Sequence, residues 1–183
     1  DPELVPVAAP VATSSVDRWA KMLTKAPPVS CLCPTYGRAS LLEEAIQCFL
    51  LQDYPGEKEI IVLNDHPGQT LHYDHPQVRV VNVPRRFASL GEKMNAGVAL
   101  CSHERIFLWY DDDIYLPHRL SLCVALGQPE RRRCLLRSDR AWFWNDGQLS
   151  GPERNVFHGG ACFSRALFRQ VQGYPSLDDG FDW

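Results

Sequence analysis

Three consecutive carboxylates, Asp111, Asp112 and Asp113, stand directly after the apolar run Ile106–Tyr110. Adjacent carboxylates at the end of a buried strand repel one another, and such an arrangement is normally kept where a cation neutralises it. Their oxygen atoms suit Mg²⁺ or Mn²⁺, and these ions in turn typically hold substrate phosphates. A solvated acidic loop is the competing interpretation, but the cost of clustering like charges beside a buried strand favours the metal site.

Two further charged residues stand where a ligand site at the edge of a sheet would use them. Asp65 follows the apolar run Glu59–Leu63, where a carboxylate can accept hydrogen bonds from a nucleobase or a ribose, although Asn64–Gly68 is also a good turn sequence. Lys93 could face diphosphate oxygens as a point charge, but a plain surface lysine on a helix is the more common role for such a residue. Both pairs of alternatives stay open at this point.

The C-terminal part of the chain adds a glycine pair and a group of carboxylates. The glycines in His158–Gly160 allow a ligand to approach the backbone closely, or they only shape a bend. Asp178, Asp179 and Asp182 offer carboxylates for a general base, or they form a solvated end.

The elements that must position these residues alternate in type along the chain, which indicates right-handed βαβ crossovers. We therefore predict an α/β fold with a mostly parallel sheet, helices on both faces, and a ligand site beyond the carboxyl ends of the strands. The expected strands are Val29–Cys33, Glu59–Leu63, Val78–Val83 and Arg105–Tyr110, with one or two more in Cys134–Trp144. The expected helices are Ser40–Gln52 and Ser89–Leu100, each opened by a Ser-x-x-Glu capping box, then Pro117–Leu126 and Ser164–Val171, the last capped by Ser164.

Composition and charge exclude several classes of partner. The 183 residues are 45% hydrophobic, enough for one domain with a proper core, and the formal net charge of -3 gives no global basic field for nucleic acid. Seven cysteines, an odd number, mostly lie inside apolar stretches, as reduced and buried thiols do. Cys31 and Cys33 form a CxC pair, but no second pair stands at zinc-site spacing.

The ends of the chain set the expected domain limits. Residues 1–28 are expected to form a linker and one short helix, with apolar residues at i, i+3, i+4 and i+7 from Val16, and residues 29–183 to form the domain, cut short at its C-terminal end. No apolar run approaches the roughly 20 residues that cross a bilayer, and no signal peptide is visible. We therefore expect a cytoplasmic protein. Any association with a membrane would come from parts outside this chain.

Taken together, these motifs resemble the family 2 glycosyltransferases, which are inverting enzymes with the Rossmann-like GT-A fold. The resemblance covers residues 29–183. Pro34-Thr35-Tyr36-Gly37-Arg38 is similar to the family's Pro-Thr-Tyr-x-Arg nucleotide loop, and Val62-Leu63-Asn64-Asp65 to the end of its second strand. Gly91-Glu92-Lys93-Met94-Asn95 is similar to the Gly-x-Lys-Arg-Asn helix start, and Trp109-Tyr110-Asp111-Asp112-Asp113 to the DxD motif. Gly180-Phe181-Asp182-Trp183 is similar to Gly-Glu-Asp-Trp. Met94 replaces the usual Arg and Phe181 the usual Glu.

The resemblance implies roles for these residues. Asp65 would meet the uracil or another base, Asp111 the ribose or diphosphate side of the donor, and Asp113 would bind the metal directly. Asp182 would be the base, with Asp179 the nearest other candidate. The remaining donor-binding residues would be Pro34, Thr35, Tyr36, Arg38, Lys93 and Asp112, with Asp111 a second metal ligand.

The implied reaction is metal-assisted, hexosyltransferase-like transfer with inversion, using Mn²⁺ or Mg²⁺. The sugar would move from a nucleoside-diphosphate sugar, with UDP the first nucleotide expected, to a hydroxyl of a carbohydrate, lipid or protein acceptor. Two other functions stay open. A nucleotidyltransferase on a related sheet would use the same cation, and a catalytically silent module would keep the nucleotide pocket for interaction only.

Overall fold

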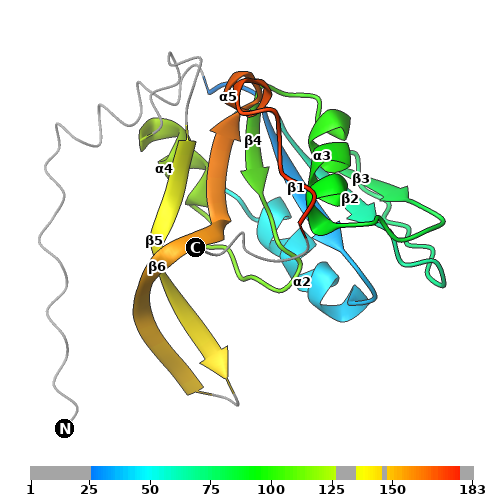
Figure 1. Cartoon of the computed structure of the whole chain (residues 1–183). Coiled ribbons are helices and arrows are strands. Elements are labelled where there is room, and N and C mark those ends of the chain that lie inside the picture. The colour runs from blue at the N-terminus through cyan, green and yellow to red at the C-terminus, as the bar shows by residue number, and fades with distance from the viewer. Residues whose placement is uncertain (1–25, 127–134, 146–147, 178–183) are drawn as a thin grey trace, which may run out of the picture.

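A computed structural model describes residues 26–126, 135–145 and 148–177 of the chain, and Figure 1 shows how their elements are arranged. The short helix expected from Val16 lies outside these residues. The strands are β1 (Val29–Thr35), β2 (Lys58–Asn64), β3 (Val78–Asn82), β4 (Arg105–Leu108), β5 (Leu135–Asn145) and β6 (Gln148–Ser164). The helices are α2 (Ala39–Leu50), α3 (Leu90–Leu100), α4 (Arg119–Leu126) and α5 (Arg165–Gln170).

The six strands form one sheet in the order β3-β2-β1-β4-β6-β5. The first four run parallel, with β1 paired to β2 on one side and to β4 on the other. β6 is antiparallel to β4 and β5 is antiparallel to β6, so the two form a long hairpin that extends away from the parallel part (Figure 1). The prediction of a mostly parallel sheet is therefore confirmed, and the chain reverses its strand order between β1 and β4.

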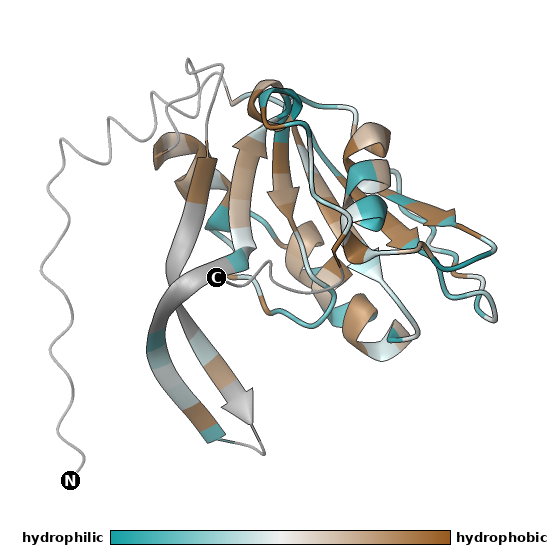
Figure 2. Cartoon of the chain, in the orientation of Figure 1, coloured by the Kyte–Doolittle hydropathy of each residue, from teal (hydrophilic) through white to brown (hydrophobic). Residues whose placement is uncertain are grey.

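Apolar side chains cover both faces of the sheet. On one face α2 and α4 pack through Leu42, Phe49 and Leu120 over a cluster that includes Val62 and Trp109. On the other face α3 packs through Met94 and Val98 over Leu32 and Ile106, with Leu167 and Phe168 of α5 beside them. Helices on both faces are thus confirmed, and in Figure 2 the apolar colours run along β4 and the upper part of β6 between these layers.

The helix starts agree only partly with the sequence. The Ser89 side chain caps α3 by accepting from the Glu92 N–H at 3.1 Å, and Ser164 caps α5 in the same way. The expected cap at Ser40 is wrong: the residue before α2 is Arg38, which makes no side-chain cap bond. The chain turns at Gly37, with φ of 73°, and the Arg38 side chain is directed to Asp111 and Asp112 instead.

The cysteines behave as expected where they are described. Cys31, Cys33, Cys48, Cys101, Cys123 and Cys162 carry free thiols, and Cys134 lies outside the described residues. Burial raises the pKa of Cys101 to about 12, which keeps this thiol protonated and inert. The part of the chain that the structure describes contains no helix that is both long and apolar enough to cross a membrane.

Candidate nucleotide-sugar site

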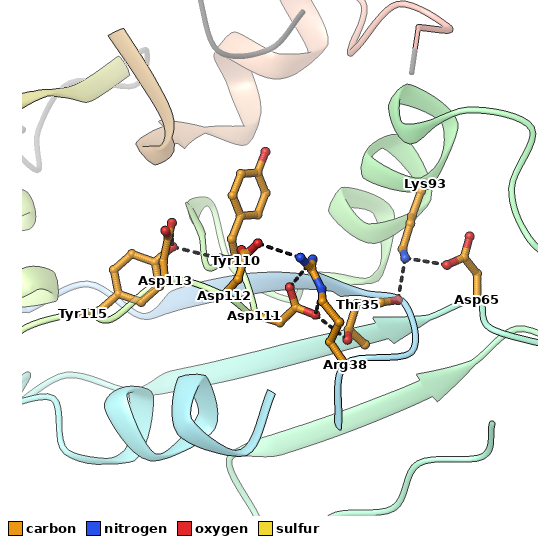
Figure 3. Close-up of polar contacts among 9 residues, drawn as sticks. All are labelled: Thr35, Arg38, Asp65, Lys93, Tyr110, Asp111, Asp112, Asp113 and Tyr115. Carbon is orange, nitrogen blue, oxygen red and sulfur yellow. Dashed lines mark hydrogen bonds and ion pairs between the residues drawn. The ribbon is translucent and has the colours of Figure 1, made fainter. Parts of the chain in front are cut away.

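The candidate site lies where three parallel strands end next to one another (Figure 3). Thr35 ends β1, Asp65 follows β2, and Asp111 follows β4, while Lys93 reaches toward them from the first turns of α3. β1 lies between β2 and β4, so these ends flank the point where strand order reverses. In open α/β sheets the crevice at such a switch point is where ligands bind.

Arg38 and Thr35 hold the first carboxylate of the acidic run. The Thr35 hydroxyl donates to Asp111 Oδ2 at 2.6 Å, and the Arg38 guanidinium donates to Asp111 Oδ1 at 2.5 Å and to Oδ2 at 3.2 Å. Burial raises the pKa of the Asp111 carboxyl, against the opposing effects of Thr35 and Arg38. Arg38 also donates to Asp112 at 2.6 Å, so one guanidinium supplies the positive charge beside two of the three carboxylates.

Lys93 and Asp65 form a second charged pair, which is buried. Lys93 Nζ lies 2.5 Å from Asp65 Oδ1 and donates to the Thr35 carbonyl at 2.7 Å. The other oxygen of Asp65 accepts from the Phe87 N–H at 3.0 Å. Burial lowers the pKa of Lys93, and the hydrogen bond to Asp65 opposes that shift. The interpretation of Lys93 as a surface lysine is wrong, because only 7% of its side chain is exposed.

Asp113 projects from the other side of the acidic run. Its side chain is exposed, and Oδ2 accepts from the Tyr115 hydroxyl at 2.9 Å. A Cβ at Gly159 would lie 2.6 Å from Asp113 Oδ2, so the missing side chain keeps space beside this carboxylate. Across residues 26–126, 135–145 and 148–177, no three His, Cys, Asp or Glu side chains converge as a metal site. Asp113 thus stands apart from Asp111, which faces Arg38.

An aromatic group stands beside the pair of Lys93 and Asp65, and it joins Tyr36, which the sequence predicted, to His66 and Arg86, which it did not. The Tyr36 and His66 rings lie 4.7 Å apart, and the Arg86 guanidinium lies 4.8 Å from the Tyr36 ring centre. Tyr36 is 38% exposed, so part of its ring is open to a ligand. Arg86 lies in the loop after β3, so its place beyond the end of a parallel strand was the signal that could have found it.

The remaining predicted residues have different outcomes. Pro34 is buried in β1 and paired in register with Leu63 of β2. His158 links two tyrosines, with Nδ1 2.5 Å from the Tyr110 hydroxyl and Nε2 3.0 Å from the Tyr174 hydroxyl. Asp179 and Asp182, the candidate bases, lie outside the described residues.

Comparison with solved structures gives the fold. TarS residues 1–349 from S. aureus has 18% identity and a TM-score of 0.66, over 85% of this chain and 52% of that one. The same protein in complex with UDP-GlcNAc has 18% identity and a TM-score of 0.64, over 80% and 48%. The mannosyltransferase PcManGT from Pyrobaculum calidifontis, in complex with GDP-Man and Mn²⁺, has 21% identity and a TM-score of 0.64, over 92% and 55%. This chain therefore spans about half the length of each.

Comparison of sequences gives the family. No curated protein matches the chain. The family model described as "Glycosyl transferase family 2" matches residues 30–169, which is more than half of the chain and includes all three strand ends of the site. The sheet order and the structural neighbours agree with the GT-A fold expected for such proteins. The chain belongs to glycosyl transferase family 2.

Proposed function

We propose that this chain binds the donor of an inverting glycosyltransferase, which moves a sugar from a nucleoside-diphosphate sugar, first of all a UDP-sugar, to an acceptor hydroxyl. The observation that carries the proposal is the convergence of Thr35, Asp65 and Asp111 at the switch point of the sheet, held by Arg38 and Lys93. Family membership and the nucleotide-bound neighbours support it. A diphosphate needs hydrogen-bond donors and positive charge; Arg38 and Lys93 carry donors, and a divalent ion would supply the net charge because both cations are already paired.

The base and the ribose would lie on the β1–β2 side of the crevice. Tyr36, partly exposed, offers a ring face for the base, and Asp65 stands at the same edge. Because both Asp65 oxygens already accept hydrogen bonds, a base would share this carboxylate with Lys93 and the Phe87 N–H. Lys93 would act on the diphosphate mainly as a nearby charge, since its ammonium is held by Asp65 and the Thr35 carbonyl.

The metal, Mn²⁺ or Mg²⁺, would sit at Asp113. Mg²⁺ is commonly held by one or two carboxylates together with substrate phosphates, and the space that Gly159 leaves beside Asp113 fits that arrangement. Asp111 would join as a ligand after Arg38 moves away, because its carboxylate has no exposed surface in this structure whereas 45% of the Arg38 side chain is exposed. When bound, the ion would supply positive charge against the leaving diphosphate.

The acceptor hydroxyl would lose its proton to Asp182, or to Asp179 as the second candidate. A general base must lie within about 2.6 to 3.2 Å of the hydroxyl, directly or through one water, so these two carboxylates are not interchangeable. Both residues follow the described segment that ends at Leu177, which lies beside the start of α3.

A second candidate function is a nucleotide-binding module without transfer. One observation favours it: the Arg38 guanidinium stands against both Asp111 and Asp112, where the positive charge of an ion would otherwise act. In that case nucleotide would bind without any need for a divalent ion.

Binding of UDP, GDP, UDP-GlcNAc and GDP-mannose, measured by calorimetry with Mn²⁺ and with EDTA, separates the two functions. We expect at least one of them to bind about tenfold or more tightly with Mn²⁺, a difference of about 1.4 kcal/mol. Asp113→Asn should abolish that difference, while Asp65→Ala should weaken binding equally in both conditions. Equal affinity in Mn²⁺ and in EDTA for the parent chain would support the module instead.

A further inference from the structure

The Arg119 guanidinium joins β4 to β6 at the point where the pairing of the two strands ends. Their antiparallel register stops at the pair of Phe107 and Cys162. Beyond that pair, Arg119 Nη2 donates to the Leu108 carbonyl at 2.8 Å and to the Gly159 carbonyl at 2.9 Å. This nitrogen carries two N–H groups, so each carbonyl can receive its own hydrogen bond. One side chain therefore sets how far the Gly159 backbone lies from the end of β4.

The same guanidinium packs against two aromatic rings. Its Cζ lies 4.0 Å from the Tyr115 ring centre and 4.9 Å from the Trp109 ring centre. Within residues 26–126, 135–145 and 148–177, its other terminal nitrogen, Nη1, is buried and has no hydrogen-bond partner. A buried donor without a partner costs stability, so the fold alone gives little reason for an arginine at this position.

Tyr115 lies between Arg119 and the acidic run. Its ring packs on Trp109 with centroids 4.2 Å apart, and Trp109 is fully buried and donates to the Ala45 carbonyl of α2 at 2.9 Å. Its hydroxyl accepts from the Tyr110 N–H at 2.9 Å and donates to Asp113 Oδ2 at 2.9 Å (Figure 3). The core thus holds the ring, and the ring directs the hydroxyl to one oxygen of an exposed carboxylate.

The start of α4 is held by the end of α2, which fixes the backbone from which Arg119 extends. The Gln52 amide donates to the Leu116 carbonyl at 2.8 Å and accepts from the Leu120 N–H at 3.1 Å. One buried side chain therefore binds the backbone on both sides of Arg119. The guanidinium reaches the two strands from a position that has little freedom to shift.

These contacts meet beside Asp113. A Cβ at Gly159 would lie 2.6 Å from Asp113 Oδ2, and the Gly159 carbonyl lies 3.4 Å from the Tyr115 hydroxyl. Arg119 therefore contacts both groups that border the space next to this carboxylate. Carboxylates that bind metal ions are themselves held by hydrogen bonds from other side chains, which orient them toward the ion.

We propose that Tyr115 and Arg119 are positioning residues of the metal site at Asp113. Tyr115 orients the carboxylate through its hydroxyl, and Arg119 keeps the Gly159 backbone and the Tyr115 ring where they leave room for the ion. The inference rests on the proposed function, because it takes Asp113 as a ligand of Mn²⁺ or Mg²⁺. Neither residue touches the nucleotide in this account, so their loss weakens metal binding and spares nucleotide binding without metal.

The test compares Tyr115→Phe with Tyr54→Phe. The first variant keeps the ring and removes the hydroxyl beside Asp113. The second removes a buried hydroxyl that donates to the Pro27 carbonyl, before the start of β1 and at the far end of that strand from the site, so it controls for the loss of one buried hydrogen bond. Electron paramagnetic resonance of Mn²⁺, titrated into each chain with UDP or with GDP, measures affinity for the ion. Calorimetry in EDTA measures affinity for the nucleotide alone.

Arg119→Lys tests the second residue at constant charge. Lysine keeps the positive charge near the ion but lacks the planar group of donors that reaches both carbonyls. A change in Mn²⁺ affinity in this variant therefore reports lost positioning and not altered repulsion between two cations.

For Tyr115→Phe we expect Mn²⁺ affinity lower by about 10- to 10²-fold, as the loss of a group that orients a metal ligand gives, with nucleotide affinity in EDTA within about twofold of the parent. Arg119→Lys should weaken Mn²⁺ binding in the same direction. Asp113→Asn should show the full loss that follows when the ligand itself is removed. Tyr54→Phe should lower the melting temperature and keep the parent's affinity for the ion.

Three results overturn the inference. If Tyr115→Phe binds Mn²⁺ as tightly as the parent, its hydroxyl does not orient Asp113. If Tyr115→Phe and Tyr54→Phe lose the same affinity, the hydroxyl only stabilises the fold. If Arg119→Lys keeps the parent's affinity, Arg119 does not position the site. A parent that binds nucleotide equally well with Mn²⁺ and with EDTA rejects the proposed metal site itself, and with it this inference.

Discussion

The two charged pairs at the strand ends differ in how far they are closed off from water. Lys93 and Asp65 have side chains that are 7% and 3% exposed, whereas Arg38 and Asp112 are each 45% exposed. A buried pair cannot be separated without leaving an unpaired charge, while an exposed pair exchanges partners with water at little cost. The difference indicates that the α3 side of the crevice is a fixed frame and that the acidic run is the part able to rearrange around a ligand.

The largest effect should come from breaking the buried pair. Lys93→Met leaves the Asp65 carboxylate buried without its cation, and such losses typically cost about 3 to 5 kcal/mol. Urea unfolding monitored by fluorescence measures the change in the free energy of unfolding.

Its control is the double variant in which Asp65→Asn accompanies Lys93→Met. Removing both charges eliminates the unpaired carboxylate, so part of the lost stability should return. A loss below about 1 kcal/mol in Lys93→Met would mean that water reaches Asp65 and that the α3 side is not a fixed frame.

The periodicity of the sequence was enough to predict the parallel part of the fold. The four expected strands correspond to β1 through β4, because buried parallel strands are continuous apolar runs bounded by turns. The caps at Ser89 and Ser164 were also predictable, since each follows from a local serine signal. Short-range sequence patterns were therefore sufficient for these strands and for these two helix starts.

Long-range contacts decided the features that the sequence did not reveal. Ser40 has the pattern of a cap, yet α2 begins after Arg38, whose side chain pairs with residues more than 70 positions away. Lysine is usually a surface residue, yet Lys93 is buried, with its ammonium held by Asp65 and by the Thr35 carbonyl. The 17 residues of β6 contain Pro152 and several glycines, which interrupt a strand pattern.

A smaller effect should appear at alkaline pH at Cys33, a buried thiol of β1, the strand that lies between β2 and β4. Burial, with a contribution from the Asp111 charge, raises the pKa of the Cys33 thiol well above its ordinary value. The unfolded chain therefore loses this proton above about pH 9 while the folded chain keeps it, so stability is complete below that pH and falls as the pH rises. One such group contributes a slope of at most about 1.4 kcal/mol per pH unit.

Cys33→Ala removes that slope whatever it does to stability at neutral pH. We expect urea unfolding under reducing conditions at pH 8, 9 and 10 to show a flatter decline in the variant than in the parent. Other buried thiols and tyrosines with raised pKa values, Cys31 and Tyr54 among them, keep some decline in both. Parallel declines would show that solvent reaches Cys33 and that the end of β1 is more open than the structure indicates.

The smallest effect is expected at the exposed pair, and it separates the two carboxylates that Arg38 contacts. Asp112→Asn removes only the exposed contact at 2.6 Å, and exposed pairs contribute about 0.2 to 1 kcal/mol. Arg38→Ala also removes the two hydrogen bonds that Arg38 donates to the Asp111 carboxylate. That side chain has no exposed surface, and among the described residues the Thr35 hydroxyl would remain as its side-chain donor. Leaving a buried carboxylate short of donors costs about 1 to 3 kcal/mol, so Arg38→Ala should destabilise the chain more than Asp112→Asn.

Urea unfolding of both variants beside Lys93→Met measures the free energy of unfolding of all three on one scale. Should Asp112→Asn cost as much as Lys93→Met, the acidic run would be as fixed as the α3 side, and Arg38 could not move aside for an ion.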